Sequence, residues 1–183
     1  MTCILACIKN KKVHMMGDKQ GSNGFIYSNY SKISKVFKNK EFLIGYTTSF
    51  RMGQLLQYNW EPPVKSSDDS EEVYLFNKVV TSILNCFKAN DFGYKDKANW
   101  EGGNFLIGWR GRLFEMQPEM SLLEHTDFTS VGSGEYHAVA AMNTLRITRT
   151  YDTDPKKFLE TALLVASRCV HGVSIEYNYI SEV

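Results

Sequence analysis

The chain has 183 residues, of which 43% are hydrophobic and 22% are charged. These are the proportions of an ordinary globular protein, and the length allows one domain over residues 1–183 with a substantial core. Lys and Arg number 21 and Asp and Glu number 20, which gives a formal net charge of +1. This balance argues against a nucleic-acid-binding protein, which needs a basic excess on one face.

The first apolar run is interrupted by Lys9, Lys11 and Lys12, where the apolar core of a signal peptide would continue. No apolar stretch approaches the roughly 20 residues that span a bilayer. We therefore expect a cytoplasmic protein without a membrane partner. The four cysteines form no CxxC pair and do not cluster with the histidines, which argues against a disulfide framework or a metal site, and we expect no cofactor. Burial as small hydrophobes is the expected role of Cys3 and Cys7 on one strand face.

The first half of the chain is predicted to form strands and then helices. Short β-prone runs bounded by polar turns predict strands at 2–9, 13–17, 24–28, 32–37 and 41–46. Helical spacing of apolar residues follows over 48–59. A second helix is predicted over 70–89, after the loop at Pro62-Pro63, with acidic residues in its first turn and Lys88 near its end, as the helix dipole favours.

The second half repeats this order after a polar connection, NDFGYKDKANWEGG, for which no strand is predicted. Strands are expected at 104–109, 112–116, about 121–125 and 128–131. A Gly-rich turn leads into a helix over 134–148. A last helix is predicted over 154–172, with Asp154 as N-cap and Pro155 in the first turn, before a closing strand in VSIEYNYI.

Grouped strands and grouped helices do not suggest alternating βαβ units. The fold class predicted is therefore α+β, with two antiparallel sheets packed face to face and helices on both outer sides. In this four-layer α-β-β-α sandwich, the first helix pair covers one sheet and the later pair covers the other.

Several motifs occur in a fixed order along the chain. A threonine at position 2 precedes the first strand, and the second strand ends in Gly17-Asp18. The segments that follow are KISKVF, FLIGYTTSFRMGQLLQ and VGSGEYHAVAA. With these motifs the sequence resembles the proteasome β-subunit family, most closely the bacterial HslV peptidase, and this resemblance implies the N-terminal-nucleophile (Ntn) hydrolase fold.

The resemblance implies a threonine peptidase in which Thr2 becomes the first residue after removal of Met1. A Thr hydroxyl needs a base within hydrogen-bond reach, and an α-amine with a reference pKa near 8 can serve. The resemblance also implies polypeptide substrates, self-association into rings and a separate AAA+ unfoldase. This chain has no GxxxxGK[ST] motif for nucleotide binding, which fits an arrangement in which a separate unfoldase binds the nucleotide.

The resemblance also assigns further site residues. Lys32 matches the active-site lysine of the family, and Asp18 matches the acid that holds it. The spacing from Thr2 to Lys32 is slightly shorter than in the family, so Lys35 is the second candidate. Ser133 matches a serine that relays the proton of the amine, although the same turn also needs Gly for its geometry. The backbone N–H of Thr48 is the candidate oxyanion donor, at a position where the family has glycine.

One departure affects the predicted activity. Where the family has an aspartate that orients the nucleophile, Arg168 and Cys169 occupy the candidate positions. Cys169 in place of an acid supports an alternative interpretation, a catalytically degenerate proteasome-like subunit that acts as a scaffold or interaction module. A third interpretation is an amidase of the same fold that acts on a small substrate.

Overall fold

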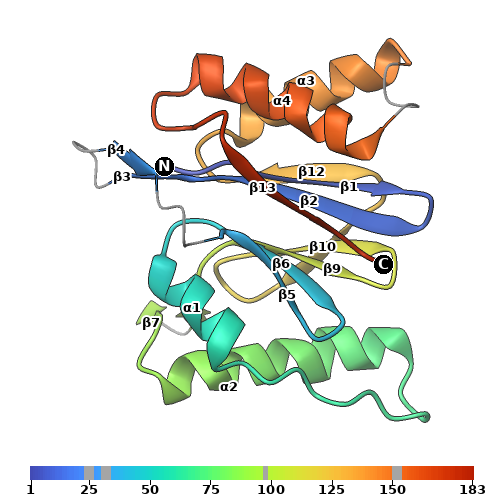
Figure 1. Cartoon of the computed structure of the whole chain (residues 1–183). Helices are drawn as coiled ribbons and strands as arrows, with labels where there is room; N and C mark the ends of the chain where they lie inside the picture. The colour runs from blue at the N-terminus through green and yellow to red at the C-terminus, as the bar shows by residue number, and fades with distance from the viewer. Residues whose placement is uncertain (23–26, 30–33, 97–98, 150–153) are drawn as a thin grey trace.

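The computed structural model describes residues 1–22, 27–29, 34–96, 99–149 and 154–183. Two antiparallel sheets face each other in these residues (Figure 1). The first sheet has the order β12 (Phe128–Val131), β1 (Ile4–Lys9), β2 (Lys12–Asp18), β13 (Tyr177–Ser181). The second has the order β11 (Leu122–His125), β10 (Arg112–Met116), β9 (Phe105–Trp109), β6 (Phe42–Tyr46), β5 (Val36–Asn39).

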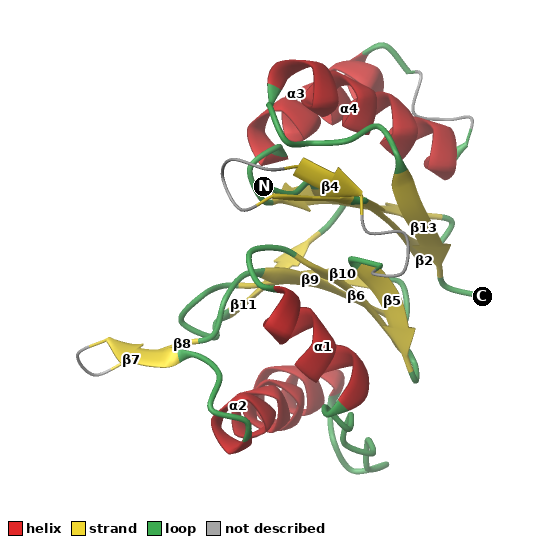
Figure 2. Ribbon diagram, turned by 60° about the vertical axis from the view of Figure 1, so that its left-hand side comes forward, coloured by secondary structure: helices red, strands yellow, loops and turns green. Residues whose placement is uncertain are grey.

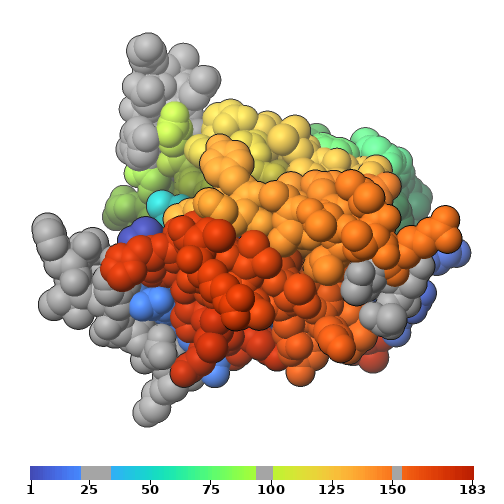
Figure 3. All heavy atoms as spheres, turned by 90° about the horizontal axis from the view of Figure 1, so that it is seen from above, coloured from blue at the N-terminus to red at the C-terminus, as the bar shows by residue number. Residues whose placement is uncertain are grey.

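Helices cover the outer face of each sheet. The second sheet is covered by α1 (Phe50–Tyr58) and by a long helix that consists of a π-helical segment, η1 (Val73–Val79), and α2 (Val80–Ala89). The first sheet is covered by α3 (Glu135–Ile147) and α4 (Pro155–Cys169), which form the face seen in orange and red in Figure 3. This arrangement confirms the predicted α-β-β-α sandwich.

Successive side chains of β1 point to opposite faces, so this strand contributes to two hydrophobic clusters, one between the sheets and one beneath α3 and α4. Ile4 and Ala6 point between the sheets, where they pack with residues such as Leu43 and Leu106. The intervening residues point toward α3 and α4, because successive strand residues face opposite sides. Cys3 and Cys7 are on this second face and are fully buried, as predicted.

The short polar strands differ from the prediction. Of the predicted strand 24–28, only 27–28 lies in the described residues, within β4 (Tyr27–Asn29), which pairs with β3 (Gln20–Ser22). The connection expected to lack strands contains the hairpin of β7 (Tyr94–Asp96) and β8 (Asn99–Glu101), which projects from the body in Figure 2. These strands have no run of alternating apolar residues, and backbone pairing rather than an apolar face defines them.

Within the described residues, no helix combines the length and the apolar character that a bilayer crossing requires.

Close packing between α1 and β6 leads to a stability prediction. A Cβ atom added at Gly53 would lie 2.2 Å from Cζ of Tyr46, and both residues are buried. We expect Gly53→Ala to lower the free energy of unfolding by about 1–3 kcal/mol, because overpacking outweighs the better helix propensity of Ala. Urea denaturation measures the change. Gln54 is the next residue in α1 and is exposed, so Gln54→Ala should change the free energy of unfolding by less than about 0.5 kcal/mol. Equal stability of Gly53→Ala and the wild type would contradict this packing argument.

Candidate active site

Thr2 lies just before β1 and contacts the turn that opens α3. Its main-chain nitrogen donates a hydrogen bond to Oγ of Ser133 at 3.0 Å, and its carbonyl accepts one from the same hydroxyl at 3.2 Å. The turn comes this close because Gly132 has a φ of +101° and a Cβ there would lie 2.4 Å from the Thr2 carbonyl oxygen. The structure thus brings together two residues that are 131 positions apart.

Asp18 ends β2 and is fully buried directly beside this site. Its Oδ1 atom accepts a hydrogen bond from the backbone N–H of Cys3 at 2.9 Å. Its Oδ2 atom accepts from the backbone N–H groups of Gln20 at 3.2 Å and Ser174 at 3.4 Å. A carboxylate held by several backbone donors is fixed in position and is suited to hold a cation.

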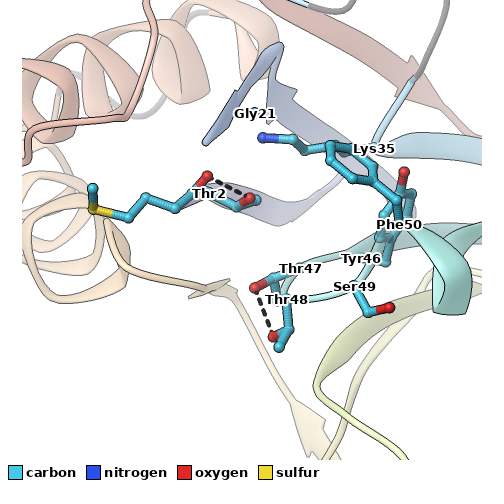
Figure 4. Close-up of a pocket in the computed structure, with 9 residues that line it drawn as sticks. Thr2, Gly21, Lys35, Tyr46, Thr47, Thr48, Ser49 and Phe50 are labelled. Atoms are coloured by element: carbon cyan, nitrogen blue, oxygen red, sulfur yellow. Dashed lines mark hydrogen bonds between the residues drawn. The ribbon is translucent and has the colours of Figure 1, made fainter. Parts of the chain in front are cut away.

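Lys35 is that cation. Its side chain is only 3% exposed, and Nζ donates to Oδ1 of Asp18 at 2.9 Å and to the carbonyl oxygen of Gln20 at 2.5 Å. Burial lowers the pKa of Lys35, while the negative charge and hydrogen bond of Asp18 act in the opposite direction. Figure 4 shows the ammonium end of Lys35 directed into the pocket that also contains Thr2.

The predicted lysine, Lys32, lies outside the described residues. The lysine that contacts Asp18 is therefore the second candidate, Lys35. Its carbonyl accepts a hydrogen bond from the Tyr46 N–H at 2.9 Å, which places it at the start of β5 and opposite β6. The signal that favoured Lys35 was present in the sequence, since the spacing from Thr2 to Lys32 was short for the family.

The pocket at Thr2 has a volume of about 40 Å³ and is closed on one side by the β6–α1 connection. Thr48 in this connection has a φ of +69°, and Ser49 caps α1 by accepting a hydrogen bond from the Met52 N–H at 3.3 Å. Thr48 is one of the residues that line the pocket, and its role as oxyanion donor stays a prediction. The lining residues are Met1, Thr2, Gly21, Lys35, Tyr46, Thr47, Thr48, Ser49 and Phe50.

Arg168 and Cys169 do not contribute to this site. Both are exposed in the last turn of α4, and neither lines the pocket at Thr2. The group that reaches Asp18 from the following segment is the backbone N–H of Ser174, which the sequence analysis did not identify. The geometry therefore gives no support to the expectation that Cys169 stands where an orienting acid is needed.

The described part of the chain contains no cluster of side chains that could bind a metal ion. Within those residues, no group of three or more His, Cys, Asp or Glu side chains is arranged to hold an ion. The groups that meet around Thr2 are its own hydroxyl, the hydroxyl of Ser133 and the buried Lys35–Asp18 pair, which are suited to proton transfer and to stabilisation of negative charge.

No protein-family model and no curated protein sequence matches the chain. Solved structures do. Thiobacillus denitrificans BPH has a TM-score of 0.81 at 14% identity, covering 98% of this chain and 96% of that one, and the same scores are found for BPH in complex with epoxomicin, with 97% of that chain covered. HslV from Trypanosoma brucei has a TM-score of 0.69 at 19% identity, covering 98% of both chains.

A third similar structure is Anbu, the ancestral β-subunit, from Yersinia bercovieri, with a TM-score of 0.64 at 13% identity, covering 98% of this chain and 81% of that one. At sequence identities this low, structural similarity shows a shared fold but not a shared activity. The sheet order, the helix pairs and these structures together show that the chain has the proteasome-like fold of the Ntn hydrolases.

Proposed function

We propose that the chain is a subunit of a threonine-type endopeptidase, in which Thr2 is the nucleophile once Met1 has been removed. One observation carries this proposal. The main-chain nitrogen of Thr2, which becomes a free α-amine on removal of Met1, lies 3.0 Å from Ser133 Oγ and beside the buried Lys35–Asp18 pair. This arrangement supplies a nucleophile, a base and a fixed positive charge in one pocket.

The proposed reaction proceeds in two steps. The neutral α-amine of Thr2 takes the proton of Oγ1 as Oγ1 bonds to the scissile carbonyl carbon, and the carbonyl oxygen becomes an oxyanion near the Thr48 N–H. The C–N bond then breaks, and the leaving amine takes the proton from the Thr2 ammonium, with Ser133 as a relay. In the second step the same amine takes a proton from water as the water oxygen bonds to the ester carbon. The C–Oγ1 bond then breaks, and the proton passes from the amine to Oγ1. Lys35 favours both the neutral amine and the developing negative charge.

Met1 blocks this chemistry while it is attached. The Thr2 nitrogen is then an amide rather than a base, and Oγ1 of Thr2 donates a hydrogen bond to the Met1 carbonyl oxygen at 2.8 Å. Met1 also lines the pocket at Thr2. The unprocessed chain is therefore expected to be an inactive form.

Intact-mass measurement of the purified protein tests the proposal. We expect the loss of one methionine and hydrolysis of an unstructured peptide. Because BPH forms a complex with epoxomicin, we also expect this inhibitor to bind the processed chain and to bind the Thr2→Ala variant at least tenfold more weakly. A processed chain that neither binds epoxomicin nor cleaves any unstructured peptide would contradict the proposal.

The degenerate scaffold is the second candidate, and the contacts of Met1 favour it. Met1 lines the pocket, and its carbonyl oxygen accepts a hydrogen bond from Oγ1 of Thr2, so the hydrogen bonds around Thr2 form with Met1 attached. A scaffold is expected to retain Met1 in the mass measurement and to show no hydrolysis.

The pH dependence of kcat/KM provides a further test. The rate should rise through neutral pH, because the Thr2 amine, with a reference pKa of about 7.7–8.0, acts only when neutral. It should fall again at a pH below the usual value of 10.5 for lysine, because burial lowers the pKa of Lys35 and loss of its proton removes the positive charge. Lys35→Arg should shift the falling limb to higher pH, since guanidinium stays protonated. A falling limb that is the same in Lys35→Arg would contradict this assignment.

We further propose that the subunits form rings that receive polypeptides from a separate AAA+ unfoldase. Large apolar side chains exposed on α1 and η1 support self-association: Tyr58 is 74%, Val73 48% and Phe76 43% exposed. We expect sedimentation at micromolar concentration to show an oligomer. A monomer under these conditions, with no partner present, would count against ring formation.

A further inference from the structure

A second cavity adjoins the candidate active site. It has a volume of about 420 Å³, against about 40 Å³ for the pocket at Thr2, and Thr48 lines both. The other walls come from three separate segments: the loop after α2, the connection between β8 and β9, and the residues that follow β10. The apolar or side-chain-free positions among them are Phe92, Gly93, Gly102, Gly103 and Pro118.

Two contacts hold the walls of this cavity in place. The ring of Phe92 packs edge-on against Phe87, with centroids 5.0 Å apart. The backbone N–H of Gly102 donates to the carbonyl oxygen of Pro118 at 2.8 Å, which joins the β8–β9 connection to the segment after β10.

Two positions in the wall of the cavity favour glycine. Gly93 and Gly103 have φ values of +89° and +115°, a conformation in which residues with side chains are strained. A Cβ at Gly103 would also lie 2.6 Å from Sδ of Met52. The backbone therefore forms part of the wall at these positions.

The polar groups of the cavity limit what can bind there. The side-chain N–H₂ of Asn104 already donates to Oε1 of Glu115 at 3.1 Å. Glu101 also lines the cavity, and no lysine or arginine is among its described lining residues, so an acidic ligand group would have no cationic partner there. The cavity is thus suited to an apolar group of a ligand rather than to an anion.

We propose that this cavity binds a large apolar side chain of the substrate polypeptide beside the scissile bond, with Phe92 and Pro118 as specificity-determining residues. The inference rests on the proposed function, because it is the shared residue Thr48 that connects the cavity to the nucleophile. Successive side chains of an extended peptide point to opposite sides. A peptide that passes Thr2 therefore presents side chains to more than one pocket, and the pocket at Thr2 is far smaller than the cavity beyond Thr48.

Peptide binding to the Thr2→Ala variant tests this without requiring hydrolysis. Fluorescence anisotropy would compare labelled, unstructured host peptides that carry a single Phe, Ala or Glu. We expect the Phe peptide to bind at least about tenfold more tightly than the Ala peptide, and the Glu peptide to bind most weakly. Adding Phe92→Ala or Pro118→Ala should reduce the Phe-to-Ala ratio to about threefold or less.

Phe128→Ala is the matched control. Phe128 also packs edge-on against another phenylalanine, Phe158, with centroids 5.8 Å apart, but it does not line the cavity. This variant should keep the full Phe-to-Ala ratio. Circular dichroism of each variant identifies any loss of fold, and Pro118→Ala provides a second test if Phe92→Ala unfolds.

The outcomes separate the two proposals. Equal affinity for all three peptides, or no binding of any, overturns the cavity assignment, as does a ratio unchanged in both Phe92→Ala and Pro118→Ala. If the Phe peptide is selected through these residues but the processed wild type cleaves no peptide, the cavity assignment stands and the proposed function fails.

Discussion

Thr2→Ala is expected to lower kcat/KM for an unstructured peptide by at least roughly a thousandfold, because it removes the nucleophile while the α-amine remains. The fold should persist. The hydroxyl of Thr2 donates to the Met1 carbonyl, a contact that processing removes in any case, and its main-chain bonds to Ser133 do not require the side chain. Steady-state hydrolysis, together with the melting temperature and the intact mass, measures both expectations.

Thr2→Ser is the matched variant. It keeps both the hydroxyl and the α-amine, so it should retain measurable activity, far above that of Thr2→Ala. Equal activity of the wild type and Thr2→Ala would refute the threonine mechanism. Activity that is absent from all three processed chains would instead favour the scaffold.

Lys35→Met is expected to have the second large effect, a loss of about 100- to 1,000-fold in kcat/KM. The reason is that it removes a fixed positive charge from a site where little water competes. It should also destabilise the fold by about 3–5 kcal/mol, since the fully buried carboxylate of Asp18 is left without its cation. Hydrolysis and urea denaturation separate these two effects.

Two further variants control for this loss of stability. In the double variant Lys35→Met/Asp18→Asn, the buried charge is gone and an amide oxygen can still accept from the Cys3 N–H, while the amide N–H₂ cannot accept from Gln20 or Ser174, so stability should recover in part while activity does not. Lys32→Ala should change kcat/KM by less than about threefold, because Asp18 is already paired with Lys35. A large loss in Lys32→Ala, with activity retained in Lys35→Met, would assign the catalytic charge to Lys32.

The sequence by itself was sufficient for the layered architecture. The apolar run of β1 and the order of strand and helix groups can be read from which residues are apolar, because this pattern is local to each segment of the chain. It did not predict β3 or the hairpin β7–β8. These strands are short and show no alternation of apolar and polar residues, and pairing with a neighbouring strand defines them.

The choice between two lysines shows what only the tertiary structure decided. Lys32 and Lys35 both follow a serine in SKISK and have the same side-chain chemistry, so in the sequence only the spacing from Thr2 distinguishes them. Pairing of Lys35 with Tyr46 across the start of β5 brings its ammonium group to Asp18. In the same way, exposure of Cys169 and the cavity beyond Thr48 follow from how distant segments pack. Residue types determine which chemistry is available, but long-range packing decides which side chains meet.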